Sequence, residues 1–357
     1  MAPWLPGAVA HAASGAVETS PIHVSAYYYP WYSDTGRHWN LGYAGKERGD
    51  GPELGRYSSR SPETIRQHLE WSEEFGIANW ICSWWGPGSW EDETMLRHVV
   101  PEIEAQNAAN PGLPQTFCLL YESEGILGLD SARGIEFDLR RAADFAEHFR
   151  HLAREYFAHP AYYRIGGKPV VYLYLSRTFS GDYVTALSRA RAVVEAQGFS
   201  LFLVGDEVYW GAPDRRRIQA FDAITSYNMH GPAEFSASHD WSDFVARSGD
   251  VFARYRSLAA EEGVGFVPGI IPGFNAGGGN RENPYYVIPR VLKPGASSVS
   301  FLKAQGAMAK EHLDSRLRSV AITSFNEWHE GTQVEPNRTL GKGAGAALRR
   351  LFETPTS

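Results

Sequence analysis

The stretch SVAITSFNEWHEGT occupies residues 319–332 and changes character halfway along. Its first half is mostly apolar, which is typical of a parallel strand buried on both faces. Its second half is polar and aromatic and places Glu327 and Glu330 three residues apart. In barrels of parallel strands, functional groups lie where the strands end at their carboxyl side. This junction therefore predicts a barrel strand that ends in a functional loop.

Seven other runs share this strand character, being rich in Val, Ile, Phe and Tyr and bounded by Gly and Pro. The eight predicted strands are His23–Trp31, Ile77–Trp85, Gln115–Glu122, Pro169–Leu175, Ser200–Glu207, Ala223–Asn228, Gly265–Gly273 and Ser319–Trp328. Helical patterns lie between them, at Pro62–Phe75, Phe137–Phe157, Asp182–Gln197, Ser242–Glu262 and Ser297–Asp314. Such alternation predicts an α/β fold, and eight strands predict a single (β/α)8 TIM barrel.

The length of 357 residues suits one barrel, so we expect a single catalytic domain over residues 22–357. Residues 1–21 are rich in Ala, Gly and Pro and are predicted to be a leader or a disordered N-terminus. The small residues at 10–13 resemble the end of a secretory signal, although a charged start and an apolar centre are missing. The expected location is therefore secreted or periplasmic.

Composition excludes several classes of function. The net charge is -7 without a Lys/Arg run, which argues against a nucleic-acid partner. No apolar stretch approaches the roughly 18 residues that a membrane span requires. The two cysteines, Cys82 and Cys118, fall on neighbouring predicted strands, and two buried free thiols are favoured over a bridge. The 11 Trp and 18 Tyr suit an oligo- or polysaccharide substrate, although most of them are expected to be packing residues.

Six predicted strands end in aromatic or acidic residues that a barrel would bring together. Buried carboxylates are costly without partners, so packing alone explains such a convergence poorly. The residues at these ends are Tyr27 to Tyr32, Ser83 to Gly86, Tyr121 with Glu122, Asp206 with Glu207, Tyr227 with Asn228, and Ser324 to Glu330.

Glu327 and Glu330 have the composition that acetal cleavage requires. One carboxyl must deliver a proton to the leaving oxygen, and a second must supply or activate a nucleophile. Burial and mutual repulsion would raise the pKa of one of them and keep it protonated near neutral pH. The alternative is a solvated helix start, but the neighbouring Trp328, His329, Gly331 and Thr332 argue against an ordinary helix surface.

We expect no metal and no cofactor. His329 and Glu330 begin like a HExxH zinc motif, but the position of its second histidine is Gln333. The glycine run at 277–279 lacks the spacing of a dinucleotide-binding loop.

The chain resembles glycoside hydrolase family 99, the endo-α-mannosidase and endo-α-mannanase family, from about His23 to Glu335. The matching pieces follow the same order along the chain. They are Tyr28 to Tyr32, His38 to Asn40, Gly55 to Ser59 with Pro62, Ile65 and His68, Gly76 with Ile77, Ser83 to Gly86, Pro272 to Phe274, and Asn326 to Pro336.

The resemblance implies a metal-free barrel that retains the anomeric configuration. It implies that Glu330 is the general acid/base, and that Glu327 deprotonates the sugar 2-hydroxyl so that a 1,2-anhydro sugar forms. It also implies substrate contacts for the strand-end residues Glu122 and Tyr227. Further residues expected to bind substrate are Tyr29, His38, Trp39, Tyr57, Trp84, Trp85, Asn228, Asn326 and Trp328.

Two segments depart from the family pattern. Glu122 is followed by Ser123 and Glu124, where the family has Glu-Pro-Tyr, and residues 275–279 read NAGGG in place of an Asp/Arg-bearing loop. The resemblance implies a mannose-containing glycan as the substrate, whereas these departures favour considering another glycan. The alternatives are the same fold and mechanism on another glycan, and a catalytically silent carbohydrate-binding barrel. The sequence predicts neither the linkage, nor endo or exo action, nor the oligomeric state.

Overall fold

The computed structural model describes residues 21–43, 46, 49–112, 114–230, 240–275 and 287–353. The predicted leader, apart from Pro21, and the glycine run at 277–279 lie outside these residues.

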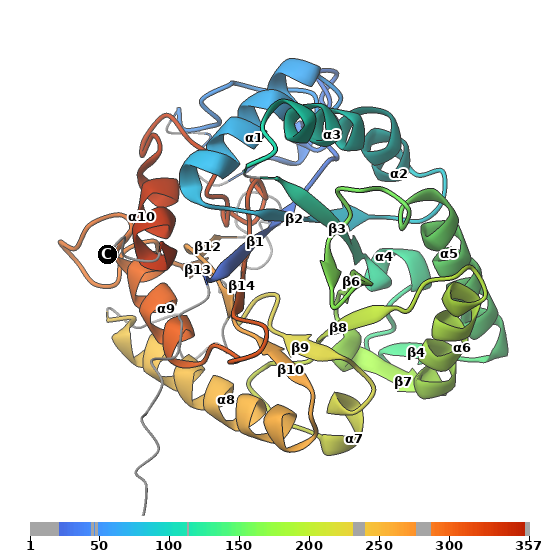
Figure 1. Cartoon of the computed structure of the whole chain (residues 1–357). Helices are drawn as coiled ribbons and strands as arrows, with labels where there is room; N and C mark the ends of the chain where they lie inside the picture. Colours follow the sequence, from blue (N-terminus) through green and yellow to red (C-terminus); the bar gives the residue numbers. More distant parts are fainter. Residues whose placement is uncertain are drawn as a thin grey trace, which may run out of the picture.

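Nine parallel strands form the barrel, and Figure 1 shows them as a central ring with the long helices outside. In spatial order the ring runs β10-β9-β8-β6-β3-β2-β1-β14-β11. Their bounds are β1 (His23–Tyr28), β2 (Asn79–Trp84), β3 (Thr116–Tyr121), β6 (Lys168–Leu173), β8 (Phe202–Asp206), β9 (Ala223–Thr225), β10 (Gly265–Val267), β11 (Gly269–Ile270) and β14 (Ser319–Ile322). Each predicted strand is present, which confirms the TIM barrel.

The seventh predicted strand is split into β10 and β11, and the split closes the ring. Pro268 separates the two halves and has no N–H to donate. On one side β10 pairs with β9, and on the other β11 pairs with β14. The Pro268 carbonyl still accepts a hydrogen bond from the Ala321 amide at 3.1 Å. This strand thus joins β9 to β14 and completes the ring.

The predicted helices form on the outside of the barrel. Helix α1 (Pro62–Phe75) begins where the Ser61 hydroxyl accepts from the Thr64 amide at 3.2 Å, and it ends at Gly76 with φ of 73°. These bounds match the prediction, because the cap and the glycine both act locally. The other predicted helices are α5 (Leu139–Glu155), α6 (Tyr183–Glu195), α8 (Ser242–Glu261) and α9 (Ser300–Glu311).

Shorter elements complete the structure. Helices α2 (Trp90–Thr94), α3 (Val100–Ala109), α7 (Arg215–Ile218) and α10 (Gly343–Phe352) join the outer layer, and the short α4 (Ser123–Leu127) lies inside α5, directly after β3 (Figure 1). A π-helical turn forms at Met95–Val99, and 3-10 turns form at Trp39–Leu41 and Ser176–Thr178. The small strands are β4 (Ile135–Phe137), which pairs with β7 (Phe179–Gly181), β5 (Arg164–Ile165), which pairs with β6, and β12 (Phe274–Asn275), which pairs with β13 (Val287–Ile288).

Both cysteines are buried and free. The register pairs Ile81 with Cys118 and Cys82 with Leu119, so the two cysteines are offset by one residue between the neighbouring strands. Because successive side chains of a strand point to opposite faces, the thiols lie on opposite faces of the sheet. This confirms the prediction of free thiols.

Within the ranges that the structure describes, no helix is both long enough and apolar enough to cross a membrane.

Candidate active site

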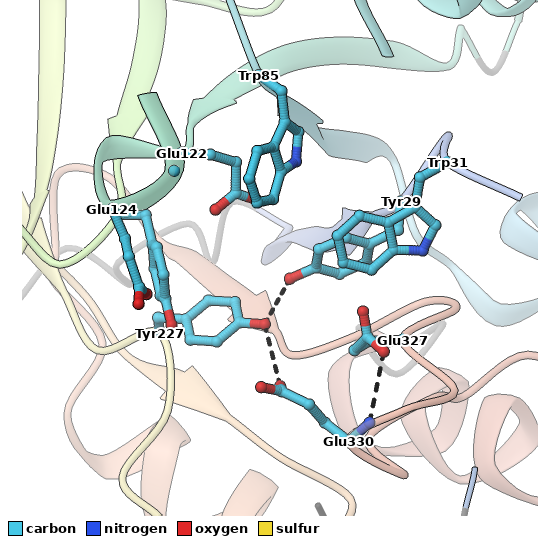
Figure 2. Close-up of a pocket in the computed structure, with 10 residues that line it drawn as sticks. Tyr29, Trp31, Trp85, Glu122, Glu124, Tyr227, Glu327 and Glu330 are labelled. Atoms are coloured by element: carbon cyan, nitrogen blue, oxygen red, sulfur yellow. Dashed lines mark hydrogen bonds between the residues drawn. The ribbon is translucent and has the colours of Figure 1, made fainter. Parts of the chain in front are cut away.

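A cavity of about 310 Å³ opens at the carboxyl end of the barrel. Six of the residues predicted to form the site line it, together with four others. The lining consists of Tyr29, Trp31, Trp85, Glu122, Glu124, Gly125, Tyr174, Tyr227, Glu327 and Glu330. Figure 2 shows Trp85 and Glu122 across the cavity from Glu330.

Glu327 and Glu330 lie on the loop that follows β14, as the sequence predicts. One carboxylate oxygen of Glu327 accepts from the His329 amide at 2.7 Å and from the Glu330 amide at 3.4 Å. The Glu327 amide donates to the Ser324 hydroxyl at 2.7 Å. The loop thus folds back on the Glu327 side chain, which brings both carboxyls to one cavity.

Burial sets the protonation of this pair. It raises the pKa of Glu327 well above its ordinary value, and the charge of Glu330 raises it further, against two backbone amides that lower it. Burial also raises the pKa of Glu330 to about 7, although a hydrogen bond from Tyr227 lowers it. No described residue in the cavity lining is Lys, Arg or His. Because no cation offsets burial, the pair retains a proton near neutral pH.

Two tyrosines connect the first strand to Glu330. The hydroxyls of Tyr29 and Tyr227 share a short hydrogen bond, and the Tyr227 hydroxyl donates to Glu330 at 3.4 Å (Figure 2). The Tyr227 ring packs edge-on against Tyr27 and Tyr174, each with ring centroids 4.9 Å apart. Packing on these two sides fixes the ring and so the direction of its hydroxyl.

A second chain of hydrogen bonds fixes Glu122, and it begins at Trp85, directly after β2. The Trp85 indole donates to the Ser83 hydroxyl at 2.9 Å, and Ser83 donates to Glu122 at 2.6 Å. Burial raises the pKa of Glu122 to about 8, although the bond from Ser83 lowers it. The Trp85 side chain remains 39% exposed, so its ring offers an apolar face to a ligand.

The Trp85 ring lies directly against Gly125 at the start of α4. A Cβ atom at this glycine would stand 2.1 Å from Cζ3 of the tryptophan, far inside contact distance. The bare backbone at Gly125 therefore allows the ring to take its place in the cavity wall.

The acidic end of the fifth predicted strand does not belong to this cavity. Asp206 forms an ion pair with Arg177, and Glu207 forms one with Arg217 at 2.8 Å. Asp206 also accepts from the Tyr227 amide at 2.9 Å. The expectation that this pair shares one site with the other strand ends is wrong, because Arg177 of the 3-10 turn and Arg217 of α7 pair with both carboxylates outside the cavity.

Glycosyl hydrolase family 99 matches this chain over residues 49–342, which is more than half of its length. The chain belongs to this family. Its curated relatives include the mouse "Glycoprotein endo-alpha-1,2-mannosidase", 25% identical over 81% of this chain and 57% of the relative. Another is the "Uncharacterized protein WxcX" of Xanthomonas campestris pv. campestris (strain B100), 26% identical over 94% of this chain and 50% of that protein. The chain spans about half the length of the curated relatives it matches.

Solved structures share the fold of this family 99 chain. A "Glycoside hydrolase-like protein" superposes with a TM-score of 0.73 at 19% identity, covering 94% of this chain and 95% of its own. A GH99 endo-alpha-mannosidase from Bacteroides thetaiotaomicron superposes with a TM-score of 0.64 at 18% identity, covering 94% and 99%. At these identities the likeness concerns the barrel itself.

Two predicted contact residues of the family 99 chain do not line the cavity. Ser83 faces inward, so the next residue, Trp84, faces outward and donates from its indole to Asp92 at 2.7 Å. The Asn228 side chain accepts from the His230 amide at 2.7 Å. Neither residue lines the cavity.

Asn326 stands behind the cavity and fixes Tyr29. Its side chain accepts from the Tyr29 amide at 2.7 Å and donates to the Tyr29 carbonyl at 3.1 Å. This pair of bonds ties the end of β1 to the loop after β14. A change at Asn326 would therefore act through the position of Tyr29.

Four further predicted residues form a layer behind the cavity. Tyr57 and Trp328 both donate to Glu335, at 2.8 and 2.7 Å. The Trp39 indole donates to the Tyr57 carbonyl at 2.8 Å. His38 stacks on Trp31 with ring centroids 4.1 Å apart. These side chains support the lining without being part of it.

Four lining residues are absent from the predicted set. Trp31 lies within the aromatic run that the sequence singles out, and Tyr174 lies at the end of the fourth predicted strand. Glu124 comes from the segment that departs from the family pattern, and Gly125 directly follows that segment. Their position just after a barrel strand is the feature of the sequence from which these residues could have been predicted.

Among the residues that the structure describes, no group of three or more His, Cys, Asp or Glu side chains is arranged to hold a metal ion.

Proposed function

We propose that this chain is a retaining glycoside hydrolase that cleaves an α-linked, mannose-containing glycan. One observation carries the proposal: two glutamates three residues apart share one cavity and have no cationic neighbour in its described lining. The mouse and Bacteroides proteins are named as endo-alpha-mannosidases, which supports mannose as the sugar. The secreted or periplasmic location stays a prediction.

The proposed reaction has two steps. Glu330 donates its proton to the glycosidic oxygen while Glu327 removes the proton from the sugar 2-hydroxyl. O2 then attacks C1, the bond to the leaving oxygen breaks, and a 1,2-anhydro sugar forms. In the second step Glu330 takes a proton from water and the water oxygen attacks C1. The C1–O2 bond breaks, and Glu327 returns its proton to O2. Two inversions at C1 give net retention.

This route differs from the usual retaining mechanism, in which a carboxylate itself attacks C1. It requires O2 and the leaving oxygen to be trans, as they are in an α-mannoside. The raised pKa of Glu330 suits an acid that must hold its proton near neutral pH. Burial raises the pKa of Glu327 as well, so the two carboxyls hold their proton as a pair. We assign the charge of this pair to Glu327, because two backbone amides donate to its carboxylate and favour its charged form.

The cavity wall supports recognition of a sugar ring. Trp85 offers its exposed face, while Glu122 and Glu124 offer acceptors for sugar hydroxyls. A volume of about 310 Å³ lies at the lower end of the range for small-molecule sites, roughly 300 to 1,000 Å³. The described cavity thus suits a small part of a glycan rather than a long segment.

A different glycan is the second candidate, and Glu124 and Gly125 favour it. Both line the cavity; Glu124 lies in the segment where the sequence departs from its family, and Gly125 follows it directly. A silent carbohydrate-binding barrel is a weaker alternative, because both glutamates are present in the cavity.

The test is turnover of a synthetic α-mannoside by the wild type and by Glu330→Ala. The proposal expects turnover with retention, observed by NMR of the first anomer released, and its loss in the variant. A chelator should leave the rate unchanged. Equal turnover by Glu330→Ala would refute the assignment. A glycan panel then separates the two substrates: cleavage confined to glycans without mannose would replace the first candidate by the second.

A further inference from the structure

The loop that carries Glu327 and Glu330 borders a second cavity. This cavity measures about 280 Å³ and is lined in part by Arg290, Gly331 and Gln333. Residues that line a cavity have no packing contacts on the side that faces it. Hydrogen bonds must therefore hold this part of the loop in place.

The hydrogen bonds come from the β12–β13 hairpin and the residues that follow it. Nη2 of Arg290 donates to the Gly331 carbonyl at 2.8 Å and to the Gln333 carbonyl at 2.7 Å. The Asn275 amide donates to the Glu330 carbonyl at 2.6 Å. Three carbonyls at and just beyond Glu330 are thus fixed from one direction.

Arg290 is a part-buried cation that contacts carbonyl groups rather than a carboxylate. Burial lowers the pKa of its guanidinium to about 10, although the charge of Asp50 raises it, so the group stays charged at neutral pH. Within the described ranges its hydrogen bonds go to the two carbonyls. Burying a cation without a carboxylate partner costs free energy. Stability alone therefore explains this residue poorly.

The hairpin accommodates Arg290 by means of a bare glycine. A Cβ atom at Gly273 would stand 2.8 Å from Cγ of Arg290 and 3.0 Å from the Ile288 carbonyl. The absence of a side chain at Gly273 lets the arginine stem pass between hairpin and loop. The stretch Pro272 to Phe274, which the sequence singles out, is thereby accounted for.

We propose that Arg290 is a positioning residue for Glu330. By holding the carbonyls of Gly331 and Gln333, it keeps the Glu330 carboxyl against Tyr227 and facing the cavity. The proposal rests on the proposed function, since it assigns Arg290 to the same reaction. Arg290 itself does not line the catalytic cavity, so it acts through the loop.

The test compares Arg290→Met, which keeps the stem but loses the donors, with Arg290→Lys, which keeps the charge. Arg290→Met should lower kcat by about 10²-fold, the effect of a misplacement of about 1 Å, with KM within about threefold of the wild type. Arg290→Lys should recover part of this loss. The control is Arg164→Met, because Arg164 also donates to backbone carbonyls, those of Phe157 and Tyr162, away from the site.

The pH profile separates positioning from general destabilisation. The bond from Tyr227 lowers the pKa of Glu330, so its loss in Arg290→Met should move the alkaline limb of kcat/KM to higher pH. An unmoved limb, with kcat reduced only in proportion to the folded fraction, would overturn the proposal.

Hydrogen exchange gives a readout that does not depend on turnover. Amides of residues 328–334 should exchange faster in Arg290→Met than in Arg164→Met, and equal exchange would overturn the proposal. If the wild type cleaves no glycoside, the proposed function fails, while the exchange rates still show whether Arg290 holds the loop.

Discussion

Two pairs of acids at the carboxyl end of the barrel differ in whether a cation lies beside them. After β8, Asp206 and Glu207 each form an ion pair with an arginine. After β14, Glu327 and Glu330 face a cavity whose described lining holds no cation. Burial does not distinguish Glu327 from the first pair, since Asp206, Glu207 and Glu327 are 2%, 4% and 3% exposed, while Glu330 is part-buried at the cavity.

The presence or absence of a neighbouring arginine decides whether a strand-end acid is suitable for catalysis. Burial raises the pKa of Glu207 as well, but Arg217 and Ser176 act against it. Around Glu330, burial and Glu124 act together against a single hydrogen bond from Tyr227. An acid that keeps its proton near neutral pH, next to open space, can deliver that proton to a ligand.

The largest effect is expected from Glu327→Gln. Removing the base should lower kcat by about 10³-fold or more while ligand binding is kept. Kinetics on an α-mannoside and calorimetry with an unreactive analogue would measure the two quantities. Glu207→Gln is the matched control, an equally buried acid whose loss should leave kcat within about threefold. Near-wild-type turnover by Glu327→Gln would remove the base assignment.

Arg217→Met should lower the free energy of unfolding and leave kcat nearly unchanged, the opposite of Glu327→Gln. It leaves Glu207 buried without its ion pair, which costs about 3–5 kcal/mol of the free energy of unfolding. Urea denaturation measures this loss, and kcat per folded molecule should stay nearly constant. A loss below about 1 kcal/mol would show that the ion pair does not offset burial of Glu207.

The acids of the cavity predict a stability that falls as pH rises. The pKa of Glu122 is raised to about 8 and that of Glu330 to about 7, both above the ordinary 4.5. A raised folded-state pKa stabilises below the unfolded value, and this contribution is lost as pH rises through the folded value. Glu122→Gln should therefore reduce the fall in the free energy of unfolding between pH 4 and pH 8 by about 4 kcal/mol, measured by denaturation. An unchanged pH dependence would contradict the raised pKa.

The smallest effect is expected from Gly125→Ala. The new Cβ would displace the Trp85 ring and should raise KM by about fivefold, or about 1 kcal/mol in binding. Gly211→Ala is the control, because a Cβ there meets no atom within 4 Å. Equal KM values for both variants would show that Trp85 does not contact the substrate.

The fold could be predicted because its signals are local. Apolar runs predict the strands, and Ser61, Pro62 and Gly76 predict the bounds of α1. Six cavity residues, among them Glu327 and Glu330, could be predicted because they follow barrel strands directly.

The rest of the site depends on contacts between distant segments. Whether Trp84 or Trp85 faces the cavity depends on a register of one residue, which the neighbouring tryptophans do not reveal. The ion pair of Asp206 joins residues 29 positions apart, and Tyr57 reaches Glu335 across most of the chain. Contacts between residues so far apart in the sequence cannot be predicted from a local sequence pattern.

The most direct test is a crystal structure with an unreactive α-mannose-configured disaccharide in the cavity. The account predicts that the 2-hydroxyl lies against Glu327 and the glycosidic oxygen against Glu330. A disaccharide bound elsewhere, or with its 2-hydroxyl away from Glu327, would contradict it.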